Sequence, residues 1–339
     1  MTKLTRADVL ELVAEATLAP SAHNAQPARW RVDRGGQWEL LEDVTRRLPF
    51  ADPSGKDATV SLGAAFEGLS LAMSRRGLSL SEPVFASTDG DTEVVPVSPF
   101  RSIAKAEPSG RSDADPLAAV TSMRRTYRGA FVPFAHPHHR LQGLAAGAPD
   151  VVLVEDVDTI RDLARTHDEA SYDFLRAPES QSELYEWMRF TPGHPAWERD
   201  GMSAPCLNMS GLTGRVASTL FRPGGFRFLK AIGLARPLTS EAAVTRSASA
   251  LLVISRLPED DWFAAGRRFY RVWLELTEMG LSACPMSLLV DDPAACAELK
   301  ERAGLDSDTV VTNVLRVGVA PERGVPKSAR LPAEEVLLP

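Results

Sequence analysis

The sequence predicts an α+β protein that is built from two related halves. Apolar residues recur at helical spacing in several segments, and the shorter apolar runs between these segments are typical of strands. One helical pattern also occurs twice, once in each half of the chain. The length of 339 residues fits about two domains, since a domain holds on the order of 150 residues.

The first half begins with an amphipathic helix, in which apolar residues recur from 9 to 18. Thr5 or Asp8 can cap its start, and Pro20 ends it, because proline lacks the N–H that a helix interior needs. Strands are predicted at 30–32 and 38–41 around Gly35-Gly36, which suggests a hairpin or adjacent strands. A helix at 61–76 that ends at Gly77 follows, and then strand-like pieces at 84–85 and 93–97. Residues 104–116 are rich in Pro, Gly, Ser and charge, which predicts a domain linker.

The second half contains the same mixture of elements. We expect helices at 117–123, 157–172 and 262–279, and strands at 151–154, 250–255 and 310–319. The run at 250–255 is continuously apolar, as expected of a buried strand. The helix at 262–279 ends at Gly280, a residue that readily adopts the left-handed conformation found after helices.

The repeated pattern lies in the helices at 61–76 and 262–279. Gly63 and Gly266 each precede a second glycine by fourteen residues, with Phe at the fourth place and aliphatic residues in matching register. Two amphipathic helices can share such a pattern by chance. The alternative is a duplicated helix that forms the central packing of an intramolecular pseudo-dimer.

Composition and charge narrow the classes of protein to consider. The chain is 44% hydrophobic and 24% charged, which is ordinary for a soluble protein. Its net charge of -7 argues against nucleic-acid binding, so an anion site must be a local cluster of Arg and Lys. The three cysteines form no Cys-x-x-Cys pair, which fits a reducing compartment. No signal peptide and no long apolar run occur, so we expect a cytoplasmic protein without a membrane partner.

The segment at 19–27 (APSAHNAQP) carries polar side chains that suit an aromatic cofactor. Ser21, Asn24 and Gln26 offer a hydroxyl and two amides for the edges of a ring. His23 can be interpreted as a catalytic acid or a ligand. Alternatively, the segment is only a turn with an Asx-type cap.

Two basic segments suit the phosphate of such a cofactor. In Arg124-Arg125-Thr126-Tyr127-Arg128, alternate residues of an extended backbone point to one side, so three of these side chains would face the same site. Guanidinium groups bind phosphate oxygens bidentately, and a hydroxyl adds a further bond. The alternative is a solvated basic helix end.

The second basic segment, at 326–332, adds Lys327 and Arg330, which could instead belong to a mobile tail. Other site motifs are missing. His136, His138 and His139 invite a metal site, but no Cys or carboxylate at a suitable spacing accompanies them, so a surface loop without metal is expected.

The motifs at 20–27, 124–128, 280–285 and 327–332 together resemble the nitroreductase superfamily of FMN enzymes. The resemblance implies α+β units, each an antiparallel-dominated sheet flanked by helices, with FMN at the interface of two units. One unit supplies the Ser-x-x-Asn-x-Gln-Pro segment and the other supplies the basic segments. Here each kind of motif occurs in one half only, so one complete site can be built.

A homodimer presents the same patch twice, whereas a fused pair is free to lose one copy. The chain therefore resembles the twin-domain, Acg-type branch of the superfamily. We expect residues 1–112 to form the first nitroreductase-like half and 113–339 the second, packed as an intramolecular pseudo-dimer. The assembly is then a pseudo-dimeric monomer or a homodimer. An insertion at about 178–237, rich in aromatic and basic residues, is expected to cover the flavin as a lid; such a stretch could instead lie on a membrane surface.

The resemblance also assigns roles to single residues. Arg128 would stabilise negative charge at the flavin pyrimidine edge, and Lys327 and Arg330 would close over the phosphate. His23 is expected to serve loop packing.

Within the segment at 280–288, which includes Pro285, Met286 and Ser287, backbone N–H groups would approach the flavin N5. Many family members have an acidic residue where Ser287 stands, so a backbone donor is expected in its place.

The function implied is FMN-dependent oxidoreduction of a small electron-poor or conjugated substrate, with NAD(P)H as a candidate donor. Two alternatives remain open at this point. One is a protein that binds or sequesters FMN with little NAD(P)H turnover. The other is a biosynthetic flavin dehydrogenase that uses oxygen as acceptor.

Overall fold

The computed structural model describes residues 4–86, 99–132, 139–321 and 324–339. The strand-like piece expected at 93–97 and the residues His136 and His138 lie outside these ranges. His139 is exposed at the start of a helix. Within the described ranges, no helix is both long enough and apolar enough to cross a membrane.

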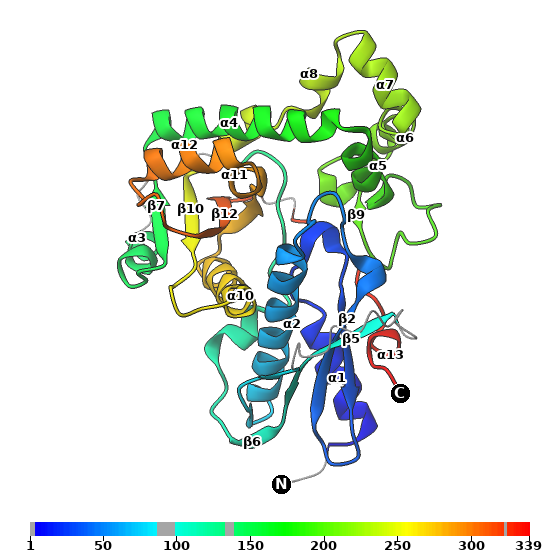
Figure 1. The fold of residues 1–339 in the computed structure, drawn as a ribbon, viewed down its shortest axis with the longest axis vertical. Helices are drawn as coiled ribbons and strands as arrows, with labels where there is room; N and C mark the ends of the chain where they lie inside the picture. The colour runs from blue at the N-terminus through cyan, green and yellow to red at the C-terminus, as the bar shows by residue number, and fades with distance from the viewer. Residues whose placement is uncertain (1–3, 87–98, 133–138, 322–323) are drawn as a thin grey trace.

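The first half forms a four-stranded antiparallel sheet with two helices (Figure 1). Its helices are α1 (Arg6–Ala16) and α2 (Lys56–Ser74), and its strands, in sheet order, are β1 (Ala28–Val32), β2 (Trp38–Asp43), β5 (Phe100–Ala106) and β4 (Val84–Phe85). Thr5 and Asp8 form a reciprocal capping box at the start of α1, which confirms the expected cap. The predicted hairpin is also confirmed, because β1 pairs with β2 in antiparallel register.

The linker predicted at 104–116 is wrong. Strand β5 runs into this range and pairs with β2, with Ala104 and Ala106 buried. A short strand, β6 (Pro108–Arg111), then pairs with β3 (Leu78–Leu80). Pro and Gly are tolerated here because β6 lies at the edge of a two-stranded sheet, where few backbone groups must be paired. The helix predicted at 117–123 is only a short 3-10 helix, η3 (Pro116–Val120).

The second half contains another four-stranded antiparallel sheet. Its strands, in sheet order, are β11 (Ser282–Pro285), β12 (Val311–Gly318), β10 (Ala250–Ser255) and β7 (Val151–Val154). Its helices include α3 (His139–Ala146), α4 (Val157–Arg176), α9 (Ala242–Thr245), α10 (Trp262–Glu278), α11 (Leu288–Asp291) and α12 (Pro293–Ala303). The strand β10 is buried in five of its six residues, as its apolar run predicts.

The two helices that share the repeated pattern pack directly against each other (Figure 1). A Cβ atom added at Gly63 would lie 2.0 Å from the carbonyl oxygen of Phe263, and one added at Gly266 would lie 2.1 Å from that of Val60. Each glycine therefore contacts the residue three places before its counterpart. A two-fold relation between α2 and α10 requires such reciprocal contacts.

A long insertion separates α4 from β10. It contains α5 (Pro178–Glu186), β8 (Met188–Arg189), β9 (Met202–Ser203), η4 (Pro205–Leu207), α6 (Gly211–Leu220), α7 (Pro223–Ala231) and α8 (Ala235–Thr239). The helices α6 to α8 project at the upper end of the molecule in Figure 1. Phe226, Leu229 and Ala235 form a small core of their own there, against Tyr172 and Leu175 of α4.

The C-terminal segment returns to the first half. Its short helix α13 (Ala333–Val336) packs on α1 and β1, and Leu337 bridges to Trp30. Leu331, Val336 and Leu337 belong to the core that α1 and α2 share. The last residues of the chain are therefore fixed beside the loop that follows α1, which brings two of the sequence motifs together.

Candidate functional site

The segment at 19–27 and the C-terminal basic segment meet, although about 300 residues separate them. Arg330 donates a hydrogen bond of 2.8 Å from Nη1 to Oδ1 of Asn24. Asn24 in turn donates from Nδ2 to the carbonyl oxygen of Ala329 at 3.0 Å. Gln26 Oε1 accepts from the backbone N–H of Leu331 at 2.9 Å. The two amides thus lock the loop after α1 to the C-terminal segment.

This loop, residues 21–26, has a strained backbone. His23, Asn24 and Gln26 have φ values of 48°, 57° and 55°. Such conformations cost about 1–3 kcal/mol each outside glycine and persist only where the surroundings impose them, often at functional sites. Here Ser21 Oγ accepts from the Gln26 N–H at 2.9 Å, and Gln26 Nε2 donates to the carbonyl oxygen of Arg199 at 3.0 Å. The loop is therefore held in one shape.

Arg124 is the most unusual side chain of the site. It is 4% exposed and lies over the ring of Trp273, 4.5 Å from its centroid. Its Nη2 donates a long bond of 3.4 Å to the carbonyl oxygen of Leu18, whereas its Nε and Nη1 have no partner. The buried hydroxyl of Tyr270 interacts electrostatically with Arg124 but makes no hydrogen bond of normal geometry. Buried polar groups are normally hydrogen-bonded, so the two unpartnered nitrogen atoms of Arg124 are free to bind an anion.

Arg125 and Arg330 lie beside Arg124, and Arg128 lies near His23. Arg128 donates to the carbonyl oxygen of Cys206 at 3.2 Å and to Sδ of Met202 at 3.4 Å. Arg125 contacts the carbonyl oxygen of Arg124, and Arg330 also donates to that of Leu18. Among the residues that the structure describes, none of the four guanidinium groups pairs with a carboxylate. The cluster is a concentration of uncompensated positive charge.

Burial beside other positive charges lowers several pKa values at this site. Burial, together with neighbouring cations, lowers the pKa of Arg124 to about 10 and that of Arg330 to about 9. Burial and the proximity of Arg128 lower the pKa of His23 to about 4, so this imidazole is neutral at neutral pH. A bound anion would offset the desolvation of these cations.

The other predicted residues take different places. Thr126 bridges to Ala283, which sets the 124–128 segment beside β11. Lys327 is exposed. Met286 is buried in the core, and its N–H donates to the carbonyl oxygen of Val314 at 2.8 Å, so that N–H is already used. Ser287 is exposed just before α11, two residues after Pro285.

Sequence reasoning missed Tyr270 and Trp273, which come from α10. A signal was available, because positions 266, 270 and 273 lie on one face of a helix and the glycine at 266 was already identified. Met202 and Cys206 were missed as well. They belong to the insertion and reach Arg128 only through tertiary packing.

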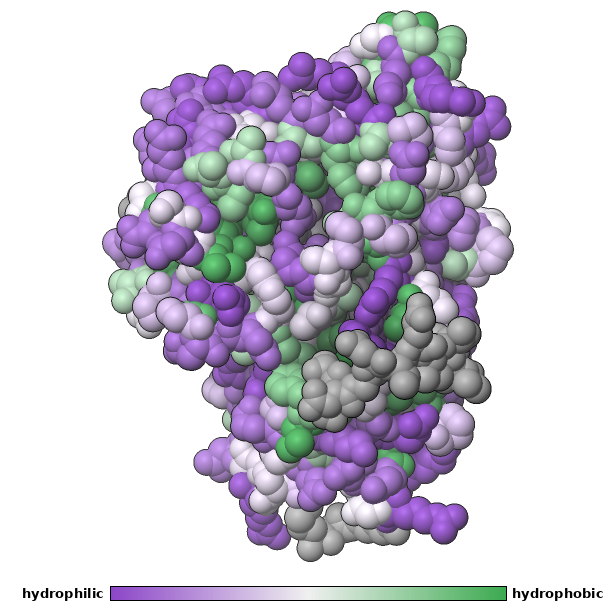
Figure 2. Space-filling model, in the orientation of Figure 1, coloured by the Kyte–Doolittle hydropathy of each residue, from purple (hydrophilic) through white to green (hydrophobic). Residues whose placement is uncertain are grey.

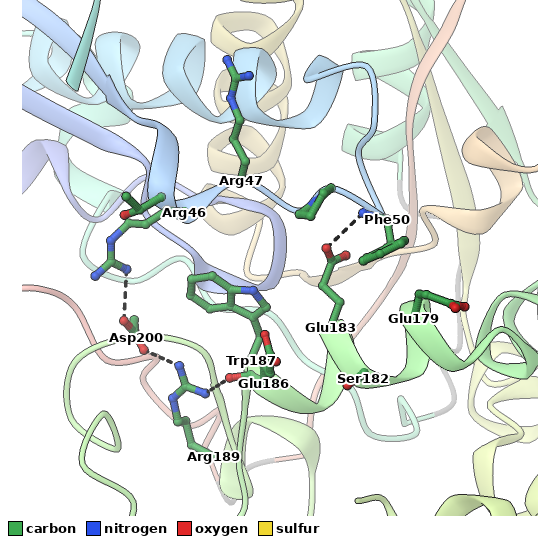
Figure 3. Close-up of a pocket in the computed structure, with 12 residues that line it drawn as sticks. Arg46, Arg47, Phe50, Glu179, Ser182, Glu183, Glu186, Trp187, Arg189 and Asp200 are labelled. Carbon is green, nitrogen blue, oxygen red and sulfur yellow. Dashed lines mark hydrogen bonds and ion pairs between the residues drawn. The ribbon is translucent and has the colours of Figure 1, made fainter. Parts of the chain in front are cut away.

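A pocket of about 560 Å³ lies behind the loop, between residues 45–50 and the insertion (Figure 3). Arg46 forms part of the wall between pocket and loop, donating to the carbonyl oxygen of Ala25 at 2.8 Å and to Asp200 at 3.0 Å. Asp200 also accepts from Arg189 at 2.6 Å. In Figure 3, Arg46 and Arg189 point toward Asp200 from opposite sides, and Arg47 points away.

The chain is similar to known proteins over most of its length. It is 25% identical over 316 residues, covering 90% of this chain and 83% of the relative, to a Mycobacterium tuberculosis (strain H37Rv) protein described as "Putative NAD(P)H nitroreductase". An uncharacterized protein of the same strain is 39% identical over 61 residues, which is 17% of this chain and 18% of that protein. No family model matches the chain.

Solved structures give a weaker likeness. A Bacteroides fragilis nitroreductase with bound FMN is 14% identical and aligns with a TM-score of 0.36, covering 64% of this chain and 95% of that one. A Mycobacterium smegmatis FMN-dependent nitroreductase in complex with NADPH is 16% identical, with a TM-score of 0.34 and coverages of 63% and 94%. Similarity at this level carries no argument about function. The sequence similarity to the Mycobacterium tuberculosis protein, in contrast, spans nine-tenths of this chain.

Proposed function

We propose that the protein is an FMN-dependent oxidoreductase that passes hydride between NAD(P)H and a small electron-poor or conjugated substrate. One observation carries the proposal: the buried guanidinium of Arg124 has two nitrogen atoms without partners and no carboxylate beside it. A buried cation in this condition is costly unless an anion neutralises it. A guanidinium fork binds the oxygens of a phosphate monoester bidentately. A neutral ligand would leave the charge of Arg124 uncompensated.

The residues around Arg124 fit the phosphorylated end of FMN. Arg125 and Arg330 add positive charge, and the hydroxyl of Tyr270 beside Arg124 is a further donor within the same cluster. Arg128 lies further along the same segment and would offset negative charge at the pyrimidine edge. When bound, FMN supplies the hydride chemistry at N5, while the protein provides binding, orientation and electrostatics.

The amides of Asn24 and Gln26 support this site by positioning the loop. Both Nδ2 bonds of Asn24 go to protein carbonyls, those of Gly201 and Ala329. They are therefore committed to joining the loop, the insertion and the C-terminal segment. Ring recognition is then left to the hydroxyl of Ser21 and to backbone groups of the strained loop.

The proposed site lies at the seam between two halves, 1–112 and 113–339. The reciprocal contacts of Gly63 and Gly266 support a pseudo-dimer of this kind. The insertion at about 178–237 would act as a lid, since its residues Gly201, Met202 and Cys206 contact the loop and Arg128. These contacts also favour a second candidate, an FMN-sequestering protein in which the lid keeps nicotinamide away from the ring.

Anaerobic titration separates these candidates. The purified protein is loaded with FMN, and the dissociation constant is measured by flavin fluorescence before NADH or NADPH is added. Bleaching of the flavin absorbance supports the oxidoreductase, and persistent colour supports sequestration.

The Arg124→Met variant tests the site itself. Losing one charge-assisted phosphate contact should weaken FMN binding about 10- to 100-fold. Arg140→Met is the matched control, since Arg140 is exposed and, within the described parts of the chain, pairs only with Glu278. Equal FMN affinity of the Arg124→Met variant and the wild type would overturn the proposed function.

A further inference from the structure

The helices α6 to α8 form an arm whose charge differs from that of the rest of the protein. Residues 201–240 contain five Arg and Lys residues and no Asp or Glu. The whole chain carries -7, so the remainder carries -12. Arg215, Arg222 and Arg227 are exposed and have no ion-pair partner among the described residues. The arm is therefore a basic surface on an acidic protein.

The same arm also exposes apolar side chains. Of the twelve large apolar residues exposed in the described parts of the chain, six lie within it. These six, Leu212, Val216, Phe228, Ile232, Leu234 and Leu238, are between 47% and 73% exposed. Figure 2 shows apolar surface at the upper end of the molecule, over these helices. A concentration of this kind on a monomer marks an interaction surface.

The exposed apolar residues are not needed to hold the arm together. Its own core consists of Phe226, Leu229 and Ala235, packed against Phe221 and Tyr172. Leu212 and Val216 lie one turn apart on the outer side of α6, with Arg215 between them. On α6, apolar and basic side chains thus share the exposed side of the helix.

We propose that this arm docks on the surface of an anionic lipid bilayer. Interfacial helices combine Leu and Phe on one face with Lys and Arg beside them, and each basic residue near an anionic surface contributes about 1 kcal/mol. The apolar side chains enter the headgroup boundary, and the basic side chains remain with the lipid phosphates. The expectation of no membrane partner rested on the lack of a spanning segment, which a surface-bound arm does not require.

A second copy of the chain fits the arm less well. A symmetric arm-to-arm contact would bring two groups of five positive charges together. A head-to-tail contact would set the arm on a surface where exposed apolar side chains are more scattered. An anionic bilayer offers negative charge and apolar depth at the same place.

Vesicle co-sedimentation of the full-length protein tests the proposal. Vesicles of phosphatidylcholine alone are compared with equal mixtures of phosphatidylcholine and phosphatidylglycerol at low and high salt. We expect binding to the anionic vesicles only, and loss of this binding as salt screens the charges. Binding to neither kind of vesicle, or equal binding to both, overturns the proposal.

Two arm variants are paired with one control. Reversing three charges (R215E/R222E/R227E) should lower partitioning to anionic vesicles by at least 100-fold, and L212S/V216S/F228S should lower it at unchanged charge. The control, R6E/R34E/R165E, changes the same net charge at exposed positions outside the arm and should bind within about threefold of wild type. FMN affinity and thermal unfolding confirm that each variant is folded. If the control loses binding as far as the arm variants, or if the arm variants instead dissolve a dimer seen in sedimentation velocity, the arm is not a lipid surface.

Discussion

Gly63 and Gly266 occupy equivalent places in the contact between α2 and α10. A Cβ atom added at Gly63 would lie 2.0 Å from a carbonyl oxygen of the opposite helix, and one added at Gly266 would lie 2.1 Å from one. Substituting either glycine with alanine should therefore push the helices apart, because backbone cannot move as a flexible side chain does. We expect each variant to lower the free energy of unfolding by about 1–3 kcal/mol, as overpacking of a core does.

Gly143→Ala is the control for this comparison. Gly143 lies within the helix α3, and a Cβ added there meets nothing within 4 Å. Alanine should stabilise this helix by about 0.5–1 kcal/mol, since glycine loses more backbone entropy on folding. Urea denaturation of the three variants measures the differences. Similar effects at Gly63 and Gly143 would show that the two helices do not pack as closely as described.

Much of the fold was predictable because local patterns agree with tertiary burial. The strands β7, β10 and β12 and the helices α4 and α10 appear where periodicity places them. The failures have a physical cause. Strand β5 is paired along β2, and its two buried alanines give little hydrophobic signal, so composition indicated a linker.

The site was only partly predictable for a related reason. The sequence pattern identified Asn24 and Arg330 as members of one site, and the structure joins them by a hydrogen bond. It could not indicate that the Asn24 amide is used within the protein, nor that Arg124 has unpartnered nitrogen atoms beside Tyr270. These features depend on which carbonyls and aromatic rings come near, and local sequence does not encode that.

His23 should make stability depend on pH in the acid range. Burial, with the nearby charge of Arg128, lowers the pKa of its imidazole from 6.5 to about 4 in the folded protein. The unfolded chain therefore binds the proton first, and stability is lost as pH falls from about 6.5 to about 4. His23→Asn, which tolerates the positive φ, should reduce this loss by about 1–3 kcal/mol.

Thermal unfolding between pH 4 and 7 measures the effect. His139→Asn is the control, because His139 is exposed at the start of α3. If the His23→Asn variant loses stability with falling pH as steeply as the wild type does, His23 is not responsible for that loss.

Asp57 should have the opposite effect near neutral pH. Burial and the negative charge of Asp291 raise the pKa of its carboxyl from 3.8 to about 7, although Lys56 lies 3.6 Å away. The folded protein thus holds a proton that the unfolded chain releases, and stability falls as pH rises from about 4 to about 7. The effect of Asp57→Asn on the free energy of unfolding should be more favourable at pH 8 than at pH 4, by about 1–2 kcal/mol.

Asp158→Asn provides the matched comparison for Asp57→Asn. Both residues lie in the first turn of a helix, but Asp158 is largely exposed and pairs with Arg161. Its substitution removes the same favourable interaction with the helix dipole at an exposed position. The free energy of unfolding of each variant is compared at pH 4 and pH 8. If the difference between the two pH values is the same for both variants, Asp291 and Lys56 do not govern the titration of Asp57.

Asp200 joins the pocket to the loop, and its charge should be essential. Its carboxylate pairs with Arg189 at 2.6 Å and with Arg46 at 3.0 Å, and all three side chains are largely buried. Asp200→Asn keeps the shape but leaves the buried guanidinium of Arg189 without a counter-charge and that of Arg46 with only Asp43, at 3.5 Å, which should cost about 3–5 kcal/mol. Asp173→Asn breaks a pair with Arg176 whose side chains are more than 60% exposed, and it should cost less than about 1 kcal/mol.

Since Arg46 also donates to the carbonyl oxygen of Ala25, FMN affinity should fall in the Asp200→Asn variant only. Equal stability of the two variants in urea denaturation would mean that the Arg46–Asp200–Arg189 network is solvated rather than buried.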